Sequence, residues 1–191
     1  RILNLFQTPI LIQNHPIMIE MSIGISLYPK NSDNIQTLLK QADMALYRVK
    51  SHGKNYYQFY SDEINEFIAL ENRQEIELNE ALEKNQFSVY YQPIFLASSQ
   101  KILYFEALVR WHHSIRGLIP AKEFIPVAEK AGLIVRLGEW VIKNVISQLS
   151  EWQQLGIKNI PVTVNISGLQ FRKQKISALI NKCLETYPIN P

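Results

Sequence analysis

Glu106, Leu108 and Arg110 occupy alternate positions of one extended, largely apolar run. Because side chains alternate along a strand, these three residues share one face, and the apolar residues between them share the other. A carboxylate and a guanidinium on one face could serve one phosphate group, the acid through a metal ion and the arginine by a bidentate contact. An internal ion pair between Glu106 and Arg110 is the structural alternative.

Asn165 directly follows Val162 and Val164 at the end of another apolar run. Its amide oxygen suits a hard cation such as Mg2+ or Mn2+, which prefers oxygen donors to thiolate. Such ions activate water and hold phosphate in phosphodiester hydrolysis, but two protein oxygens do not complete a catalytic site. The alternative is an Asx cap for the turn that follows, a common role of Asn before Ser.

Two other pairs of residues invite a chemical interpretation. His112 and His113 are adjacent, and neighbouring side chains point apart on a strand, so we expect neither to be catalytic. Lys50 and Lys54 lie one helical turn apart around Gly53. Ordinary positive charges at the end of a helix are sufficient to explain them.

The first part of the chain indicates a hairpin, a helix and a strand. Two apolar runs, residues 10–13 and 17–27, flank a short polar turn, which predicts the hairpin. Gly24 in the second run indicates a bulge or a close backbone approach. A helix capped by Asn34 or Asp33 follows and should stop at Gly53. An aromatic strand follows over residues 56–60.

The second part alternates strands and helices. We expect a long helix over residues 61–84, strands at 87–96 and 102–111, a polar loop at 112–117, helices at 121–130 and 135–155, a strand at 160–166 and a helix at 175–186. This order predicts an α/β fold in which crossover helices connect a parallel sheet or barrel layer.

Five blocks of the second part occur in a characteristic order. They are Tyr91-Gln92-Pro93-Ile94, residues 105–111 with Glu106-Ala107-Leu108, Gly117-Leu118-Ile119-Pro120, residues 124–129, and Val164-Asn165-Ile166-Ser167 followed by Gln170-Phe171. They resemble the first half of an EAL domain, the bacterial phosphodiesterase family that hydrolyses cyclic di-GMP. The resemblance implies a partial (β/α)8 barrel, because such barrels need about 250 residues.

The same resemblance implies roles for individual residues. Glu106 and Asn165 would bind Mg2+ or Mn2+, Arg110 would contact phosphate, and Gln92 would lie near a guanine base. Leu108, Pro120 and Glu129 would line the nucleotide pocket. Gln92 as a plain polar residue at a strand end, and Glu129 as a solvated helix end, are the alternatives.

The first part also resembles a known family. Ser22-Ile23-Gly24-Ile25-Ser26, residues 38–50 and Gly53-Lys54-Asn55 are similar to the C-terminal half of a GGDEF domain, the diguanylate cyclase family. The resemblance implies that Lys50 and Lys54 contact nucleotide phosphates, and it allows GTP as a partner of this part in a longer parent protein. The signature turn of that family does not occur in the chain, so we do not expect cyclase activity from it.

Composition limits the other function classes. The 191 residues carry a net charge of only +3 without a basic arm, which argues against a partner that is a nucleic-acid polymer. The single cysteine, Cys183, lies in an apolar helical pattern and is expected to be a buried thiol, which suits the cytoplasm. We expect no membrane segment, because Pro9, Asn14 and Pro16 interrupt the longest uncharged run.

The sequence therefore predicts an α+β remnant of a GGDEF-like domain (residues 1–60), a connecting helix (61–84) and a truncated EAL-type barrel (85–191). The parent protein would hydrolyse cyclic di-GMP to the linear dinucleotide, and this chain alone would be inactive. The alternative is a catalytically degenerate module that acts as a nucleotide receptor or interaction scaffold. Open strand edges predict a homo-oligomer, unless further segments of a longer chain cover them.

Overall fold

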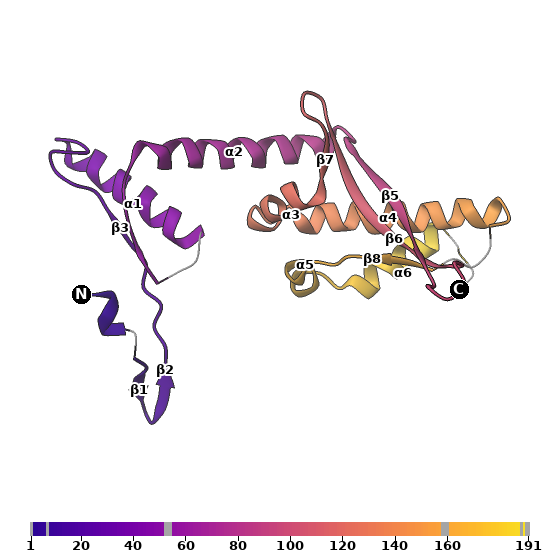
Figure 1. Ribbon diagram of the computed structural model, residues 1–191, viewed down its shortest axis with the longest axis horizontal. Helices are drawn as coiled ribbons and strands as arrows, with labels where there is room; N and C mark the ends of the chain where they lie inside the picture. The colour runs from indigo at the N-terminus through magenta and orange to yellow at the C-terminus, as the bar shows by residue number, and fades with distance from the viewer. Residues whose placement is uncertain (1, 7, 52–54, 158–160, 188, 190–191) are drawn as a thin grey trace. The chain divides into compact units, whose positions relative to one another are not determined.

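The computed structural model describes residues 2–6, 8–51, 55–157, 161–187 and 189. The chain forms two compact units, residues 1–72 and 73–191. Figure 1 follows it from the indigo N-terminal segment to the yellow C-terminal helices. Among the described residues, no helix is both long enough and apolar enough to cross a bilayer.

The first unit combines short strands with one long helix. Its elements are the 3-10 helix η1 (Leu3–Phe6), β1 (Ile10–Ile12), β2 (His15–Ile17), β3 (Ile23–Ile25), α1 (Ile35–Ser51) and β4 (Tyr57–Phe59). Between β1 and β2, Gln13 and Asn14 have positive φ angles of 51° and 65°. A two-residue type I′ turn requires positive φ at both positions, so the predicted hairpin is confirmed. Its turn is formed by Gln13 and Asn14 rather than by residues 14–16, because His15 and Pro16 belong to β2.

The prediction of one continuous strand over residues 17–27 is wrong. β2 ends at Ile17, and β3 pairs in parallel with β4, with Ile23 opposite Tyr57. Gly24 lies so close to α1 that a Cβ atom there would overlap the carbonyl oxygen of Ala42 and the backbone nitrogen of Leu46. The close backbone approach expected at Gly24 is therefore confirmed, and α1 is the element that approaches it.

Helix α1 begins at the predicted cap. The Oδ1 atom of Asn34 accepts hydrogen bonds from the backbone N–H groups of Gln36 and Thr37 at 2.9 and 3.1 Å. These bonds satisfy two of the donors that every helix leaves free at its start. The helix ends at Ser51, and the predicted stop at Gly53 lies outside the described residues.

The second unit is built around a four-stranded sheet. Its elements are α2 (Asp62–Glu83, which begins in the first unit), β5 (Phe87–Phe95), β6 (Ile102–His113), β7 (Gly117–Pro120), α3 (Ala121–Lys130), α4 (Ile134–Gln154), β8 (Val162–Val164), α5 (Gly168–Lys173) and α6 (Ile176–Thr186). β6 pairs antiparallel with β5 on one edge. Its other edge pairs antiparallel with β7 at residues 110–113 and parallel with β8 at residues 105–107. The parallel β6–β8 pair, connected through α3 and α4, confirms the predicted crossover.

The predicted loop at residues 112–117 is shorter than expected, a turn over residues 114–116. β6 continues to His113, which pairs with Gly117 at the start of β7. The polar histidines carry no apolar alternation, so this extension depends on the partner strand rather than on a local pattern. Gly117 has a φ of +72°, which glycine adopts readily, and it allows the tight return of the chain.

The two faces of β6 differ as the alternation predicts. Ala107 and Trp111 are only 4% and 2% exposed and face the helices. In Figure 1, α4 runs along this sheet, and its Val141 and Val145 pack in one cluster with Ala107. The opposite face carries Glu106, Leu108 and Arg110. The helices therefore pack against the face of the sheet that lies opposite the candidate site.

Cys183 of α6 is buried, as predicted. It packs in a cluster with Ile142 and Ile146 of α4. The thiol therefore contributes to the contact between these two helices, as a small apolar side chain would.

Candidate functional site

The structure brings Glu106 and Asn165 together, although 59 residues separate them in the sequence. Glu106 lies opposite Thr163 in the parallel β6–β8 pair, and Asn165 follows the last residue of β8. The Nδ2 atom of Asn165 donates a hydrogen bond to Oε1 of Glu106 at 2.7 Å. The contact therefore lies at the carboxyl end of β8, although Glu106 itself lies well before the end of β6.

Neither structural alternative describes these two residues. The helix cap after β8 is Ser167, whose hydroxyl accepts a hydrogen bond from the backbone N–H of Leu169 at 3.2 Å. Asn165 is thus free to face Glu106 rather than the turn. Within the described part of the chain, Glu106 and Arg110 form no ion pair, and Arg110 instead donates to the carbonyl oxygen of Val109 at 3.0 Å.

Gln92 lies in the same row of the sheet. It is the register partner of Glu106 in the β5–β6 pair, so Gln92, Glu106 and Thr163 are adjacent across three strands. We call these three residues and Asn165 the polar row. Gln92, Thr163 and Asn165 are exposed and Glu106 is partly exposed, and each offers at least one side-chain oxygen. The polar row is therefore a set of oxygen donors on an accessible sheet face.

Arg110 and Leu108 lie further along the same face of β6. Arg110 is the register partner of Pro120, which ends β7 directly before α3. The Arg110 guanidinium carbon lies 5.6 Å from the ring centre of Tyr90, and Tyr90 is the register partner of Leu108. Sequence reasoning did not select Tyr90, but its alternation with Gln92 along β5 is the signal that could have identified it.

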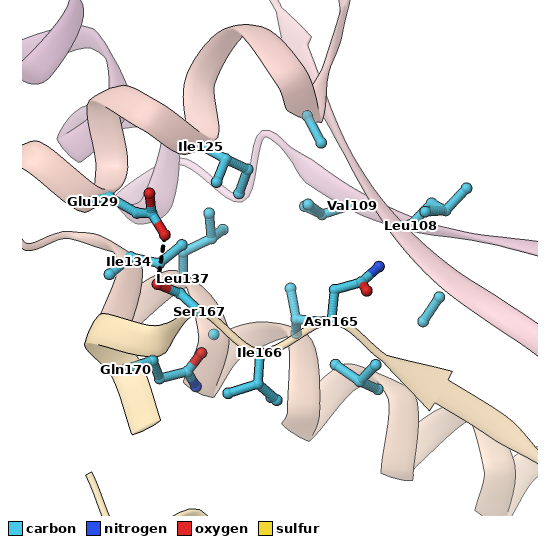
Figure 2. Close-up of a pocket in the computed structure, with 15 residues that line it drawn as sticks. Leu108, Val109, Ile125, Glu129, Ile134, Leu137, Asn165, Ile166, Ser167 and Gln170 are labelled. Atoms are coloured by element: carbon cyan, nitrogen blue, oxygen red, sulfur yellow. Dashed lines mark hydrogen bonds between the residues drawn. The ribbon is translucent and has the colours of Figure 1, made fainter. Parts of the chain in front are cut away.

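Glu129 supports the loop that carries Asn165. Its carboxylate accepts a hydrogen bond of 2.5 Å from the Ser167 hydroxyl, which Figure 2 shows reaching from the end of α3 to the start of α5. Glu129 is exposed, but this bond fixes the chain directly after β8. Glu129 is therefore not simply a solvated residue at a helix end. Sequence reasoning did not select Ser167.

A pocket of about 270 Å³ lies beside this loop, between the sheet and helices α3 and α4. Asn165, Leu108 and Glu129 line it together with mostly apolar side chains such as Ile125 and Leu137. Glu106, Gln92 and Arg110 are not part of its lining. Ligand pockets usually measure about 300–1,000 Å³. The pocket is therefore near the lower end of this range, and it adjoins the polar row at Asn165.

Gln170 is the third residue near the site, after Tyr90 and Ser167, to which sequence reasoning assigned no role. It is 1% exposed and lies against Gly138 of α4, where any side chain would overlap it. Its Nε2 donates to Gln174 at 3.3 Å, and Gln174 in turn donates to Glu139. Gln170 thereby attaches α5 to α4 and restrains the loop that contains Asn165. Its place in the Gln170-Phe171 block was the available signal.

The remaining candidates are not members of the polar row. Lys50 is exposed in the last turn of α1, in the first unit, and Lys54 lies outside the described residues. His112 lies 2.6 Å from the hydroxyl of Ser88, measured from Nε2. His113 is on the opposite face of β6, with its ring 5.2 Å from that of Trp111.

The largest pKa shift near the site belongs to Tyr91, on the face of the sheet that packs against the helices. Burial, assisted by the negative charge of Glu151, raises the pKa of Tyr91 to about 12. The Tyr91 ring packs edge-on against Trp152, with 4.8 Å between ring centres. Tyr91 therefore points away from the polar row, although Gln92 next to it belongs to that row.

Family models match both parts of the chain. The EAL domain matches residues 75–191, and the diguanylate cyclase GGDEF domain matches residues 1–56. The chain belongs to the EAL domain family, with part of a GGDEF domain in tandem before the EAL part. The predicted tandem and the mixed α/β class are thereby confirmed.

Curated relatives match the chain over nearly its whole length. The chain is 37% identical over 191 residues to signaling protein YkoW of Bacillus subtilis, and 36% identical over 183 residues to MucR of Pseudomonas aeruginosa, which is named a bifunctional diguanylate cyclase/cyclic di-GMP phosphodiesterase. It is 35% identical over 185 residues to the cyclic di-GMP phosphodiesterase PdeR of Escherichia coli. These matches cover 100%, 96% and 97% of this chain but only 24%, 27% and 28% of the relatives. The chain thus spans about a quarter of their length.

Solved structures agree on the fold. The PaMucR phosphodiesterase in complex with c-di-GMP is 36% identical with a TM-score of 0.59, covering 62% of this chain and 48% of that one. The S helix-GGDEF-EAL structure of Vibrio cholerae LapD is 18% identical with a TM-score of 0.51, covering 82% of this chain and 36% of that one. The second match supports the fold alone.

Proposed function

We propose that a longer protein containing this chain, the parent protein, hydrolyses cyclic di-GMP to the linear dinucleotide with the help of Mg2+ or Mn2+. The observation that carries this proposal is the 2.7 Å contact between Glu106 and Asn165 at the carboxyl end of β8. Membership of the EAL family and the similarity to PdeR and MucR support the same reaction.

The polar row suits a hard divalent cation. A carboxylate and an amide oxygen are the donors that Mg2+ and Mn2+ prefer. The oxygen and nitrogen of an amide exchange places by rotation of the amide group, so Asn165 can present its oxygen to an ion bound by Glu106. When bound, such an ion lowers the pKa of water and holds a phosphate oxygen.

The neighbouring residues would bind the nucleotide. Arg110 offers a planar guanidinium, which fits a phosphate better than an ammonium group does. Gln92 and Leu108 would contact a base on the same face, and Pro120 would shape the segment that faces Arg110. Glu129 would act through Ser167, by holding the loop after β8, and contact of Glu129 with the nucleotide is not required.

The other assignments remain proposals of the same kind. We assign residues 1–60 to the GGDEF-like part, 61–84 to the connecting helix and 85–191 to the EAL part. We also propose that GTP binds near Lys50 and Lys54 in the parent protein and that the chain self-associates. A cytoplasmic location would give the protein access to a nucleotide messenger.

The proposal is tested by incubating the parent protein with cyclic di-GMP and Mg2+ or Mn2+ and separating the products by chromatography. We expect metal-dependent formation of the linear dinucleotide, reduced at least about a hundredfold in Glu106→Gln. Glu185→Gln, which removes an exposed carboxylate on α6, should leave the rate unchanged.

The chain alone should give no turnover. Among the described residues, no group of three or more His, Cys, Asp or Glu side chains could hold a metal ion, so Glu106 and Asn165 lack further carboxylate support. Clear turnover by the chain alone, or nucleotide binding without hydrolysis by the parent protein, would contradict the proposal. The second result would identify a nucleotide receptor.

A further inference from the structure

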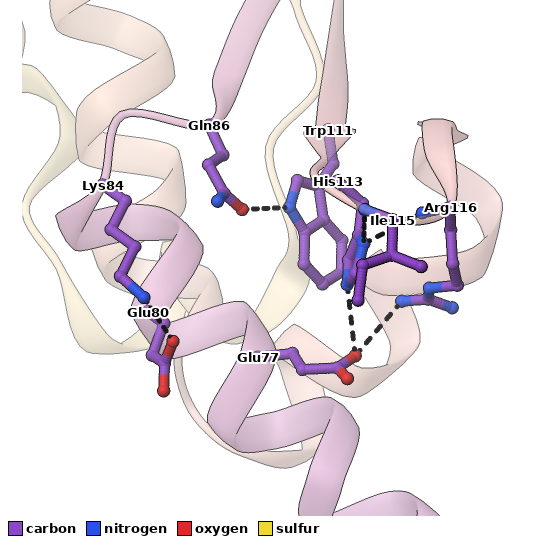
Figure 3. Close-up of polar contacts among 8 residues, drawn as sticks. All are labelled: Glu77, Glu80, Lys84, Gln86, Trp111, His113, Ile115 and Arg116. Carbon is purple, nitrogen blue, oxygen red and sulfur yellow. Dashed lines mark hydrogen bonds and ion pairs between the residues drawn. The ribbon is translucent and has the colours of Figure 1, made fainter.

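A polar cluster joins the last turns of α2 to the turn between β6 and β7. The Oε2 atom of Glu77 lies 3.6 Å from Nε2 of His113 and 3.4 Å from a guanidinium nitrogen of Arg116. Figure 3 shows Glu77 reaching both side chains from the helix. We call these three residues the Glu77 cluster. It lies within the second unit and is not part of the polar row.

The ring of His113 is fixed from both sides. Its Nδ1 accepts hydrogen bonds from the backbone N–H groups of Ile115 and Arg116 at 3.1 and 3.2 Å. An accepting nitrogen carries no proton, so the ring proton of neutral His113 is assigned to Nε2, which faces Glu77. The His113 side chain is only 10% exposed. One imidazole therefore holds the turn and directs its N–H group at the connecting helix.

Trp111 and Gln86 connect the cluster to the end of α2. The Arg116 guanidinium lies 5.5 Å from the ring centre of Trp111, and the indole N–H of Trp111 donates to Gln86 at 3.1 Å. The backbone carbonyl of Gln86, just after α2, accepts from the backbone N–H of His112 at 2.8 Å. The end of α2 is thus attached to β6 by backbone as well as by side chains.

The hairpin held by this cluster carries two residues of the candidate site. His113 pairs with Gly117 next to the turn, and Arg110 pairs with Pro120 three positions further along the same ladder. Because backbone hydrogen bonds join the two strands of an antiparallel ladder, we expect a displacement of the turn to move the paired residues beyond it. Among the described residues, the Arg110 side chain donates to the neighbouring carbonyl oxygen of Val109 and lies near Tyr90. We therefore expect its direction to follow its strand.

We propose that Glu77 is a positioning residue, which attaches the β6–β7 turn to the connecting helix through His113 and Arg116. This attachment sets the positions of Arg110 and Pro120 relative to a phosphate-containing substrate. The effect on substrate rests on the proposed function, whereas the attachment of the turn does not. Glu77, His113 and Arg116 all lie in the second unit, so this attachment is a property of that unit.

The expected effect is local. The Glu77 and Arg116 side chains are 34% and 42% exposed, and partly solvated ion pairs contribute little to global stability. Loss of the Glu77 carboxylate should therefore favour opening of the turn without unfolding the core. Glu80 on the same helix offers a matched control, because it pairs at 2.7 Å with Lys84, just after the end of α2. Among the described residues, no ion pair or side-chain hydrogen bond joins Glu80 to the hairpin.

The attachment is tested by hydrogen exchange on the parent protein without nucleotide. In Glu77→Ala, we expect the amides of Ile115 and Arg116 to exchange about threefold faster or more, while residues 141–150 of α4 keep their rate. Glu80→Ala should change neither segment. Unchanged exchange at the turn in Glu77→Ala, equal acceleration in Glu80→Ala, or acceleration of residues 141–150 as well would each overturn the proposal.

The effect on substrate is tested by kinetics of cyclic di-GMP hydrolysis with the same variants. Glu77→Ala should raise KM about threefold or more and leave kcat within about twofold, because Glu106 and Asn165 are not part of the hairpin turn. Glu80→Ala should leave both constants unchanged. Faster exchange with an unchanged KM would overturn the positioning role. Absence of hydrolysis in the wild type would instead refute the proposed function, and the exchange experiment would still decide the attachment.

Discussion

The Glu106 carboxylate lies on an open sheet face with one amide beside it. An ionised carboxylate has about four lone-pair sites, and the Asn165 amide occupies one of them. Within the described part of the chain, Asn165 is the side chain that hydrogen-bonds to Glu106. The remaining sites are accessible from the side of Gln92 and Thr163, so the carboxylate can bind a cation without first breaking an ion pair.

Tyr91 predicts how stability depends on alkaline pH. Burial raises its pKa from 10.0 to about 12, so the folded protein favours the neutral phenol. This stabilisation is fully present below pH 10 and is lost as the pH rises from 10 to 12. Because Tyr91 is only half-buried, we expect the loss to be about 1 kcal/mol or less.

The test compares urea unfolding at pH 9 and pH 11. Tyr91→Phe should lose less stability than the wild type over this interval, and the exposed Tyr90→Phe should behave like the wild type. An equal loss in the wild type and Tyr91→Phe would contradict the assignment.

Individual residues differ in how far the sequence could predict them. The alternation along β6 correctly placed Ala107 and Trp111 on one face, because a strand has a fixed period. That this face is the buried one is seen in the structure. The contact between Glu106 and Asn165 could be expected only from the family resemblance. It depends on the register of β6 against β8, which no local pattern specifies. The bond from Ser167 to Glu129 is equally non-local.

At the scale of elements, the contact between β3 and α1 depends on a missing side chain. In Gly24→Ala, the added methyl group would overlap the backbone of Ala42 and Leu46, and backbone cannot move aside as a flexible side chain can. We expect the first unit to lose about 1–3 kcal/mol of stability. Gly168→Ala is the matched control, because its nearest neighbour is the Arg172 side chain at an ordinary 3.7 Å.

Two probes separate the units in this test. All three tryptophans, Trp111, Trp140 and Trp152, lie in the second unit, so their fluorescence reports on its unfolding. Circular dichroism also reports on α1. Gly24→Ala should lower the urea midpoint seen by circular dichroism and leave the fluorescence midpoint nearly unchanged. Unchanged circular dichroism would show that α1 can move away from β3.

The elements that the sequence predicted well have strong local signals. Helix α1 has a cap at Asn34, and α4 has a long apolar stripe that ends before Gly156, whose φ of +79° stops a helix. The errors occurred where pairing decides the structure. β3 continues the apolar run of β2 but pairs with β4, and β7 forms because β6 offers it an edge.

For the whole molecule, the sheet of the second unit predicts association of the isolated chain. Within the described residues, β8 pairs with β6 alone, so its other edge is unpaired. Unpaired edges favour pairing with another chain. Light scattering over a range of concentrations should show a mass above 22.2 kDa that rises with concentration. A monodisperse species of 22.2 kDa would contradict this expectation.

The proposed metal site of Glu106 and Asn165 is tested most directly by Mn2+ binding to the parent protein, measured by electron paramagnetic resonance without nucleotide. Wild type and the Glu185→Gln control should bind Mn2+ with equal affinity. Glu106→Gln and Asn165→Ala should each weaken binding at least about tenfold, because each removes one oxygen donor. Equal Mn2+ affinity in all four proteins would contradict a metal ion held between these two side chains.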